Sequence, residues 1–116
     1  MIEKENEAAK VLAKNGYVVE QNPIVPGSRN PDYLIEGEVF DCYTPQNLNS
    51  ARGIASVIQG KIDNGQTNRI ILNLSIWQKN GGNVDDIINQ LNAWPIDGLI
   101  EVKIINQYNE VIDIYP

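Results

Sequence analysis

Apolar residues recur at helical spacing in three stretches of the chain, residues 2–15, 51–63 and 84–94. In each stretch they follow the i, i+3, i+4, i+7, i+8 template, which places their side chains on one face of a helix. Asn-Gly pairs end the first two stretches as typical C-terminal caps, and Asn49 or Ser50 supplies an N-cap for the second. We therefore predict helices over these three ranges.

Short runs rich in branched and aromatic residues predict strands over residues 17–20, 70–74, 99–105 and 111–115. The run 70–74 is almost continuously apolar, which suits a central strand covered on both faces. Residues 75–83 contain two consecutive glycines and are expected to form a loop. This order of elements predicts a single α/β domain, residues 1–116, with a mixed β-sheet flanked by helices.

Residues 30–45 predict a β-hairpin that turns at Glu36-Gly37. A loop that is symmetric about this dipeptide pairs Tyr33 with Phe40 and places Asp32 opposite Asp41. Like charges paired across strands are destabilising, so a bound cation is expected between them. The alternative is two independent aspartates, one capping a turn and one at a strand end, because an odd loop length would separate the pair.

Two charged residues, Glu5 and Lys61, fall on the apolar stripes of the first two predicted helices. Each has a structural interpretation, because the helix dipole favours an acid in the first turn and a lysine near a helix end extends its ammonium group to solvent. The functional alternative is that both side chains point into a site. Together with the two aspartates they would supply three carboxylates and one ammonium group, a set that suits metal-dependent cleavage of a phosphodiester.

The composition limits which catalytic groups and binding sites the chain can have. The chain has 116 residues, 42% of them hydrophobic, with one cysteine and no histidine. An intramolecular disulfide and histidine-based catalysis are excluded, and a structural zinc site is not expected. Catalysis would have to use carboxylates, lysine, tyrosine or a hard metal such as Mg²⁺. The formal charge of −6 argues against general nucleic-acid binding but does not exclude a nuclease, whose metal-binding carboxylates count as negative. No apolar run reaches the length of a membrane span, and the first residues do not resemble a signal peptide.

Pro31-Asp32 followed by Asp41-Cys42-Tyr43 resembles the PD-(D/E)xK restriction-endonuclease-like superfamily. A longer set of segments resembles the C-terminal nuclease toxin domains of contact-dependent growth inhibition proteins (CdiA-type) and related polymorphic toxins. These segments are Glu5-Asn6-Glu7, residues 12–17, Asn30-Pro31-Asp32-Tyr33, residues 40–45, and residues 61–66 with Asn73-Leu74. The resemblance spans about residues 5–75, and the remaining residues are similar only in pattern.

The resemblance implies a toxin that cleaves tRNA, is secreted or delivered from the cell surface into the cytoplasm of a neighbouring bacterium, and is neutralised by a cognate immunity protein. It also implies Mg²⁺ or another divalent cation, held by Asp32, Asp41 and the backbone carbonyl of Cys42. In this family pattern Glu5 orients a metal-bound water.

The chain departs from the superfamily pattern at Tyr43, where a lysine is expected, and Lys61 is the natural substitute. Tyr43 then either contacts phosphate or packs. Gln66 and Arg69, at the junction of helix and strand, are further candidates for substrate contact, each with a purely structural alternative.

Two other functions fit the residues. A DNA endonuclease of the same fold would use the same metal site, and no feature reads a 2′-hydroxyl. A non-catalytic module would instead dock a basic partner on an acidic face. Lys61 distinguishes a nuclease from a docking module. Hydrolysis needs the charge of Lys61 near the carboxylates, whereas a docking face would not place this lysine on a buried stripe.

Overall fold

The computed structural model describes residues 2–21, 33–45, 50–65 and 67–116, with the backbone only for residues 2–6 and 21. The elements along the chain are α1 (Ile2–Lys14), β1 (Val19–Gln21), β2 (Tyr33–Ile35), β3 (Glu38–Tyr43), α2 (Ala51–Asp63), β4 (Arg69–Asn73), α3 (Ser75–Lys79), α4 (Val84–Ala93), β5 (Glu101–Ile105) and β6 (Val111–Tyr115).

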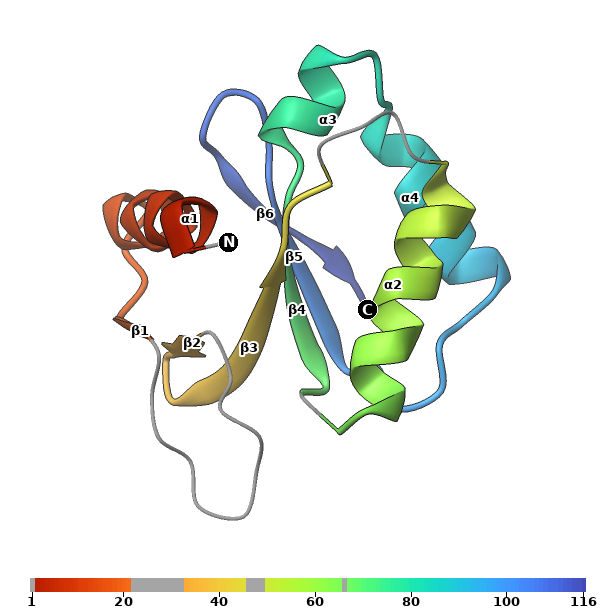
Figure 1. Ribbon diagram of the computed structural model, residues 1–116, viewed down its shortest axis with the longest axis horizontal. Helices are drawn as coiled ribbons and strands as arrows, with labels where there is room; N and C mark the ends of the chain where they lie inside the picture. The colour runs from red at the N-terminus through yellow and green to blue at the C-terminus, as the bar shows by residue number, and fades with distance from the viewer. Residues whose placement is uncertain (1, 22–32, 46–49, 66) are drawn as a thin grey trace.

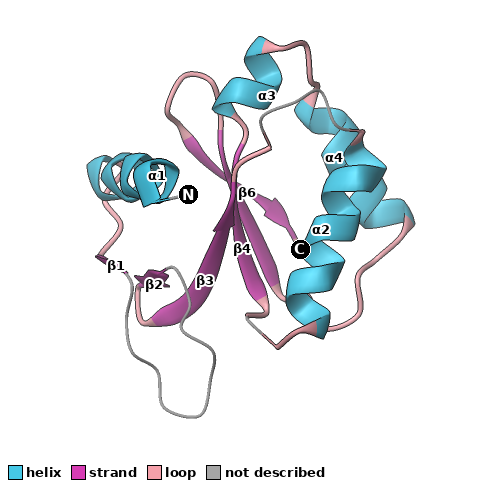
Figure 2. Cartoon of the chain, in the orientation of Figure 1, coloured by secondary structure: helices cyan, strands magenta, loops and turns pink. Residues whose placement is uncertain are grey.

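The strands of the described chain form one sheet in the order β1-β2-β3-β4-β5-β6. Strands β3, β4 and β5 run parallel to one another, and the connections between them pass through helices. The outer strands β1, β2 and β6 are antiparallel to their neighbours. Figures 1 and 2 show α1 on one side of this sheet and α2, α3 and α4 on the other. The predicted mixed sheet flanked by helices is therefore confirmed.

The hairpin between β2 and β3 has the predicted register. Tyr33 pairs with Phe40, Leu34 with Val39 and Ile35 with Glu38. Glu36 and Gly37 have φ angles of 51° and 81°, as a two-residue type I′ hairpin loop requires, so this Glu-Gly dipeptide makes the turn that Asn-Gly usually makes. The expected position of Asp32 opposite Asp41 lies outside the described residues.

Each face of the sheet has its own hydrophobic core. Beneath α1, Ala8 and Leu12 pack against Tyr33, Phe40 and neighbouring strand residues. On the other face, the buried side chains of α2, α3 and α4 meet the alternate residues of the parallel strands. This second core contains Ile54, Ile58, Ile70, Leu72, Leu74, Trp77, Ile87, Leu91, Ile96, Leu99, Val102 and Ile104. The central strand β4 contributes to both cores, as its continuously apolar sequence predicted.

The second predicted helix has the expected bounds, and Ser50 is its N-cap, accepting a hydrogen bond from the Gly53 N–H at 3.0 Å. The other predicted helix and strand ends move by no more than two residues, and β6 has its predicted bounds. The predicted loop 75–83 begins with α3. Val57, which the helical spacing from Ile54 predicts on the apolar face of α2, is exposed. Trp77 explains α3: its ring is buried and lies where a Cβ of Gly82 would be, 2.3 Å from the nearest ring atom. Burial of this side chain selects the helical turn. None of the helices in the described part is both long and apolar enough to cross a lipid bilayer.

Candidate active site

Strand β3 lies between β2 and β4 and joins the hairpin to the parallel part of the sheet. Residues 38–40 pair with β2, whereas residues 41–43 pair with β4. Side chains alternate along a strand, and because Phe40 belongs to the core beneath α1, Asp41 faces α2. The carboxylate therefore lies where the hairpin and the parallel part of the sheet meet.

Asp41 and Lys61 form an ion pair between this strand and α2. Lys61 Nζ lies 3.8 Å from Asp41 Oδ2, a contact of opposite charges that is longer than a hydrogen bond. Asp41 is 2% exposed, and the Lys61 side chain is 21% exposed. Lys61 follows Ile54 and Ile58 at positions i+7 and i+3, so the spacing that buries these isoleucines also directs the lysine stem toward the sheet. The structure thus brings together two of the predicted catalytic residues.

The two residues that follow Asp41 point to opposite faces. Tyr43 shares the face of Asp41 and packs against the core on the α2 side. Cys42 packs against the core beneath α1, with its Sγ 4.0 Å from Thr44 Oγ1. A contribution of Cys42 to a metal site would therefore come from its backbone carbonyl, as the family resemblance implies, while its thiol faces the other way.

The Arg69 side chain lies on the opposite face of the sheet from the Asp41–Lys61 pair. Arg69 begins β4, on the α1 side of the sheet, and its guanidinium group lies 3.2 Å from Glu38 Oε2 and 3.3 Å from Glu101 Oε1. A role for Arg69 in substrate contact stays a prediction, as does that of Gln66, which lies outside the described residues.

Two other predicted site residues, Glu5 and Asp32, lack described side chains. Glu5 belongs to α1, across the sheet from Lys61, and its side chain is not described; Asp32 lies outside the described residues. Among the side chains that the structure describes, no three Asp, Glu, Cys or His groups gather closely enough to hold a metal ion. A metal site of the predicted composition, with Asp32, Asp41 and the Cys42 carbonyl, therefore depends on Asp32.

Lys103, a buried lysine in β5, is a charged residue of the core that was not predicted from the sequence. Its Nζ lies 2.6 Å from Asp113 Oδ1 and 3.0 Å from Glu101 Oε2, and 5.0 Å from the centre of the Tyr17 ring. Burial by itself lowers the pKa of Lys103, but the hydrogen bonds to Asp113 and Glu101 outweigh it and raise the pKa from 10.5 to about 12. The alternation Glu101-Val102-Lys103-Ile104 was the available signal, since it places the two charged residues on one face of a strand.

Comparisons with known proteins identify the family of this chain. Residues 29–111 match the model of the contact-dependent growth inhibition CdiA C-terminal domain. A curated relative, the tRNA nuclease CdiA-2 of Burkholderia pseudomallei strain 1026b, is 41% identical over 113 residues, which are 97% of this chain and 4% of the relative. The chain thus spans only a small part of that protein. A solved CdiA-CT/CdiI toxin and immunity complex from Burkholderia pseudomallei contains a chain with a TM-score of 0.89 and 40% identity, over 99% of this chain and 84% of that one. This chain therefore belongs to the family of CdiA C-terminal domains of contact-dependent growth inhibition.

Proposed function

We propose that this domain is a metal-dependent endoribonuclease toxin that cleaves tRNA in the cytoplasm of a competing bacterium and is neutralised by a cognate immunity protein. The relative that covers almost the whole chain is named a tRNA nuclease, and the solved neighbour is a toxin and immunity complex. Membership of the CdiA family supports delivery from the surface of one cell into another.

The observation that carries the catalytic part of this proposal is the buried Asp41 beside Lys61. Taking a carboxylate out of water is costly, and a pair of apolar residues would usually stabilise the same position at least as well. A buried carboxylate with a specific cationic partner is a candidate for a functional site.

The Asp41 carboxylate suits a hard divalent cation, because it offers oxygen atoms, the donors that Mg²⁺ prefers. Asp41 would hold the ion together with Asp32 and the carbonyl of Cys42. The chemistry that such an ion supplies when bound is polarisation of a phosphate oxygen and a lower pKa of an attacking water.

The other two residues act on the substrate and the nucleophile. Lys61 Nζ, 3.8 Å from the Asp41 carboxylate, would stabilise the negative charge that develops on the phosphate. Glu5 would orient the attacking water. Tyr43 would contact the substrate phosphate or pack beside these groups, because it lies on the same sheet face as Asp41.

The test is incubation of the purified domain with total bacterial RNA and with plasmid DNA, in Mg²⁺ or in EDTA. Asp41→Asn keeps the size of the side chain and removes its charge, so we expect it to reduce cleavage by at least about 100-fold, as losses of catalytic groups generally do. Asp97→Asn, a change in an exposed turn outside the site, is the matched control and should retain wild-type activity.

The pattern of products distinguishes the alternatives. Loss of discrete tRNA bands by the wild type with Mg²⁺, but not with EDTA and not with Asp41→Asn, would establish the proposal. Nicked plasmid with intact RNA would replace it by a DNA endonuclease, and no cleavage of either would favour a binding module.

A further inference from the structure

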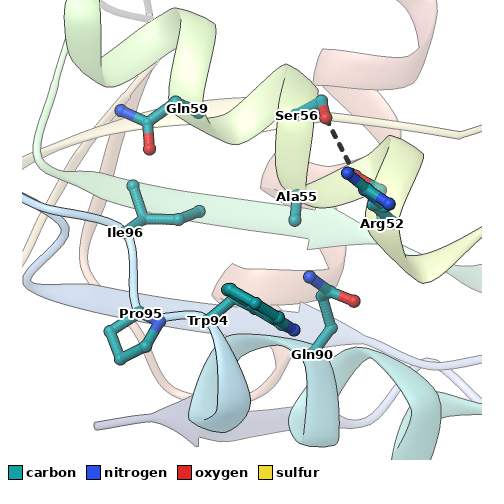
Figure 3. Close-up of a pocket in the computed structure, with 8 residues that line it drawn as sticks. All are labelled: Arg52, Ala55, Ser56, Gln59, Gln90, Trp94, Pro95 and Ile96. Atoms are coloured by element: carbon teal, nitrogen blue, oxygen red, sulfur yellow. Dashed lines mark hydrogen bonds between the residues drawn. The ribbon is translucent and has the colours of Figure 1, made fainter.

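A groove of about 580 Å³ lies between α2 and the segment that ends α4, outside the Asp41–Lys61 site (Figure 3). Ala55 and Ile96 provide apolar surface within it. Figure 3 shows Arg52 projecting from α2 and Gln90 from α4 on opposite sides of the groove, with the ring of Trp94 next to Gln90. No residue of this groove took part in the proposed catalytic site.

Trp94 is the most unusual residue of the groove. It is 72% exposed, whereas the other tryptophan, Trp77, is buried in the core. Trp94 is the C-cap of α4, and its φ and ψ of −132° and 74° take the chain out of the helical path, so the ring lies along the groove instead of continuing the helix face. Tryptophan is one of the residue types enriched among those that contribute most to binding.

Arg52 is the charged side chain among those that line the groove. Within the described residues, Lys61, Arg69 and Lys103 each form an ion pair with an acidic side chain. No such ion pair involves Arg52. Asp86 and Arg52 both line the adjoining pocket, and no ion pair joins these two side chains. In a chain of formal charge −6, a guanidinium without an ion-pair partner among the described residues, in one groove with an aromatic ring, favours an anionic, planar ligand.

We propose that this groove holds an unpaired nucleotide of the RNA substrate, with the base stacked on Trp94, the phosphate bound by Arg52 and the base edge hydrogen-bonded by Gln90. Aromatic stacking combined with a nearby cation is how proteins bind single-stranded RNA, and amide side chains read the edges of splayed bases. A volume of about 580 Å³ has the scale of a small-ligand site. This inference rests on the proposed ribonuclease function and identifies a part of the substrate that it recognises.

The position of the groove defines which substrates would use it. Arg52 and Lys61 belong to the same helix, α2, and are nine residues apart. At the rise and turn of an α-helix they are about 14 Å apart along the axis and on opposite sides of it. An RNA that contacts both must cross α2, so it must extend well beyond the cleaved bond. The groove would thus favour a large structured RNA over a short oligonucleotide.

The first measurement is the affinity of bulk deacylated bacterial tRNA for the domain in the cleavage-inactive Asp41→Asn background. Trp94→Ala should weaken binding by about 5- to 100-fold, the loss that corresponds to one stacked base. Trp94→Phe keeps an aromatic face and should retain most of the affinity. Tyr108→Ala removes an equally exposed aromatic residue, 74% exposed in the turn before β6, and should change binding by no more than about twofold.

The second measurement is kinetic, in the domain with Asp41 intact. With bulk tRNA, Trp94→Ala and Arg52→Gln should raise KM without lowering kcat, which is the signature of a lost binding contact. With a short RNA oligonucleotide, neither variant should differ from the wild type. Because Trp94 is mostly exposed, the variant is expected to fold, and its thermal melt checks this.

The outcomes separate the two proposals. Unchanged affinity and KM of Trp94→Ala, in a domain that still cleaves tRNA, would refute the nucleotide site and leave the nuclease intact. A wild type that neither binds nor cleaves tRNA would refute both. If Trp94→Ala weakened binding of the purified cognate immunity protein but not of tRNA, the groove would belong to a protein partner and the inference would be wrong.

Discussion

Replacing Lys61 by methionine tests whether the Asp41–Lys61 pair interacts energetically as its geometry indicates. Methionine preserves most of the apolar stem of lysine and removes the ammonium group. Asp41, 2% exposed, would then be a buried carboxylate without its nearby cation. We therefore expect the variant to lose both RNA cleavage and stability.

The magnitude follows from the separation of 3.8 Å between Lys61 Nζ and Asp41 Oδ2. Coulomb's law gives about 4 kcal/mol at an effective dielectric constant of about 20 and about 1 kcal/mol at that of water. Because the Lys61 side chain is 21% exposed, solvent screens part of the attraction, and a coupling of about 2 kcal/mol lies between the two limits.

A double-mutant cycle measures this coupling directly. Urea unfolding of the wild type, Lys61→Met, Asp41→Asn and the double variant, all without added metal, gives the four free energies of unfolding. Lys61→Met should lose about 2–4 kcal/mol, because removal of one partner leaves a buried charge, and the double variant should lose less than the sum of the single losses. Lys79→Met, an exposed lysine at the end of α3, is the control and should change stability by less than about 0.5 kcal/mol. Additive losses within about 0.5 kcal/mol would show that the two side chains do not interact.

Three further predictions concern the scaffold. Gly82→Ala should destabilise the fold by about 1–3 kcal/mol, because the new Cβ would lie 2.3 Å from the Trp77 ring. Gly60→Ala, inside a helix with open space around the glycine, should stabilise the fold by up to about 1 kcal/mol. Thermal melts of both variants test these two expectations. The pKa of Lys103 is raised from 10.5 to about 12. The contribution of the charged Lys103 to the free energy of unfolding is therefore complete below pH 10.5 and is lost as the pH rises through 12. The stability difference between wild type and Lys103→Met, measured by urea unfolding, should therefore shrink by about 2 kcal/mol across that range, and a constant difference would contradict the raised pKa. Ser50→Ala should cost about 0.5–2 kcal/mol in urea unfolding by removing the N-cap bond of α2, and Ser50→Asp should restore most of it.

Local patterns determined much of the fold. The spacing of apolar residues predicted α2 with its observed bounds and located the other two long helices to within one residue at each end. The Glu36-Gly37 turn predicted the register of the hairpin, since a two-residue loop leaves one way to pair the strands. These predictions succeeded because they depend only on residues that are close in sequence and on the periods of a helix or a strand.

The sequence predicted contacts between different helices and strands less well. It indicated that Asp41 and Lys61 were candidates for one site, but the distance between them depends on how α2 packs against β3. It grouped Arg69 with the same site, whereas the structure places that side chain on the opposite face of the sheet, paired with Glu38 and Glu101. The difference arises because the side-chain period of a strand is two residues, so its start determines which face a residue occupies.

The sequence by itself thus determined which residues share a face of each helix or strand, the turn of the hairpin and the candidate charges of the site. Only the tertiary structure decided that Lys61 reaches Asp41, that residues 75–79 form α3 around a buried Trp77, and that Trp94 and Arg52 line one groove. The physical reason is that periodicity fixes directions within one element, whereas the neighbour that a side chain meets on another element is selected by the packing of the whole core.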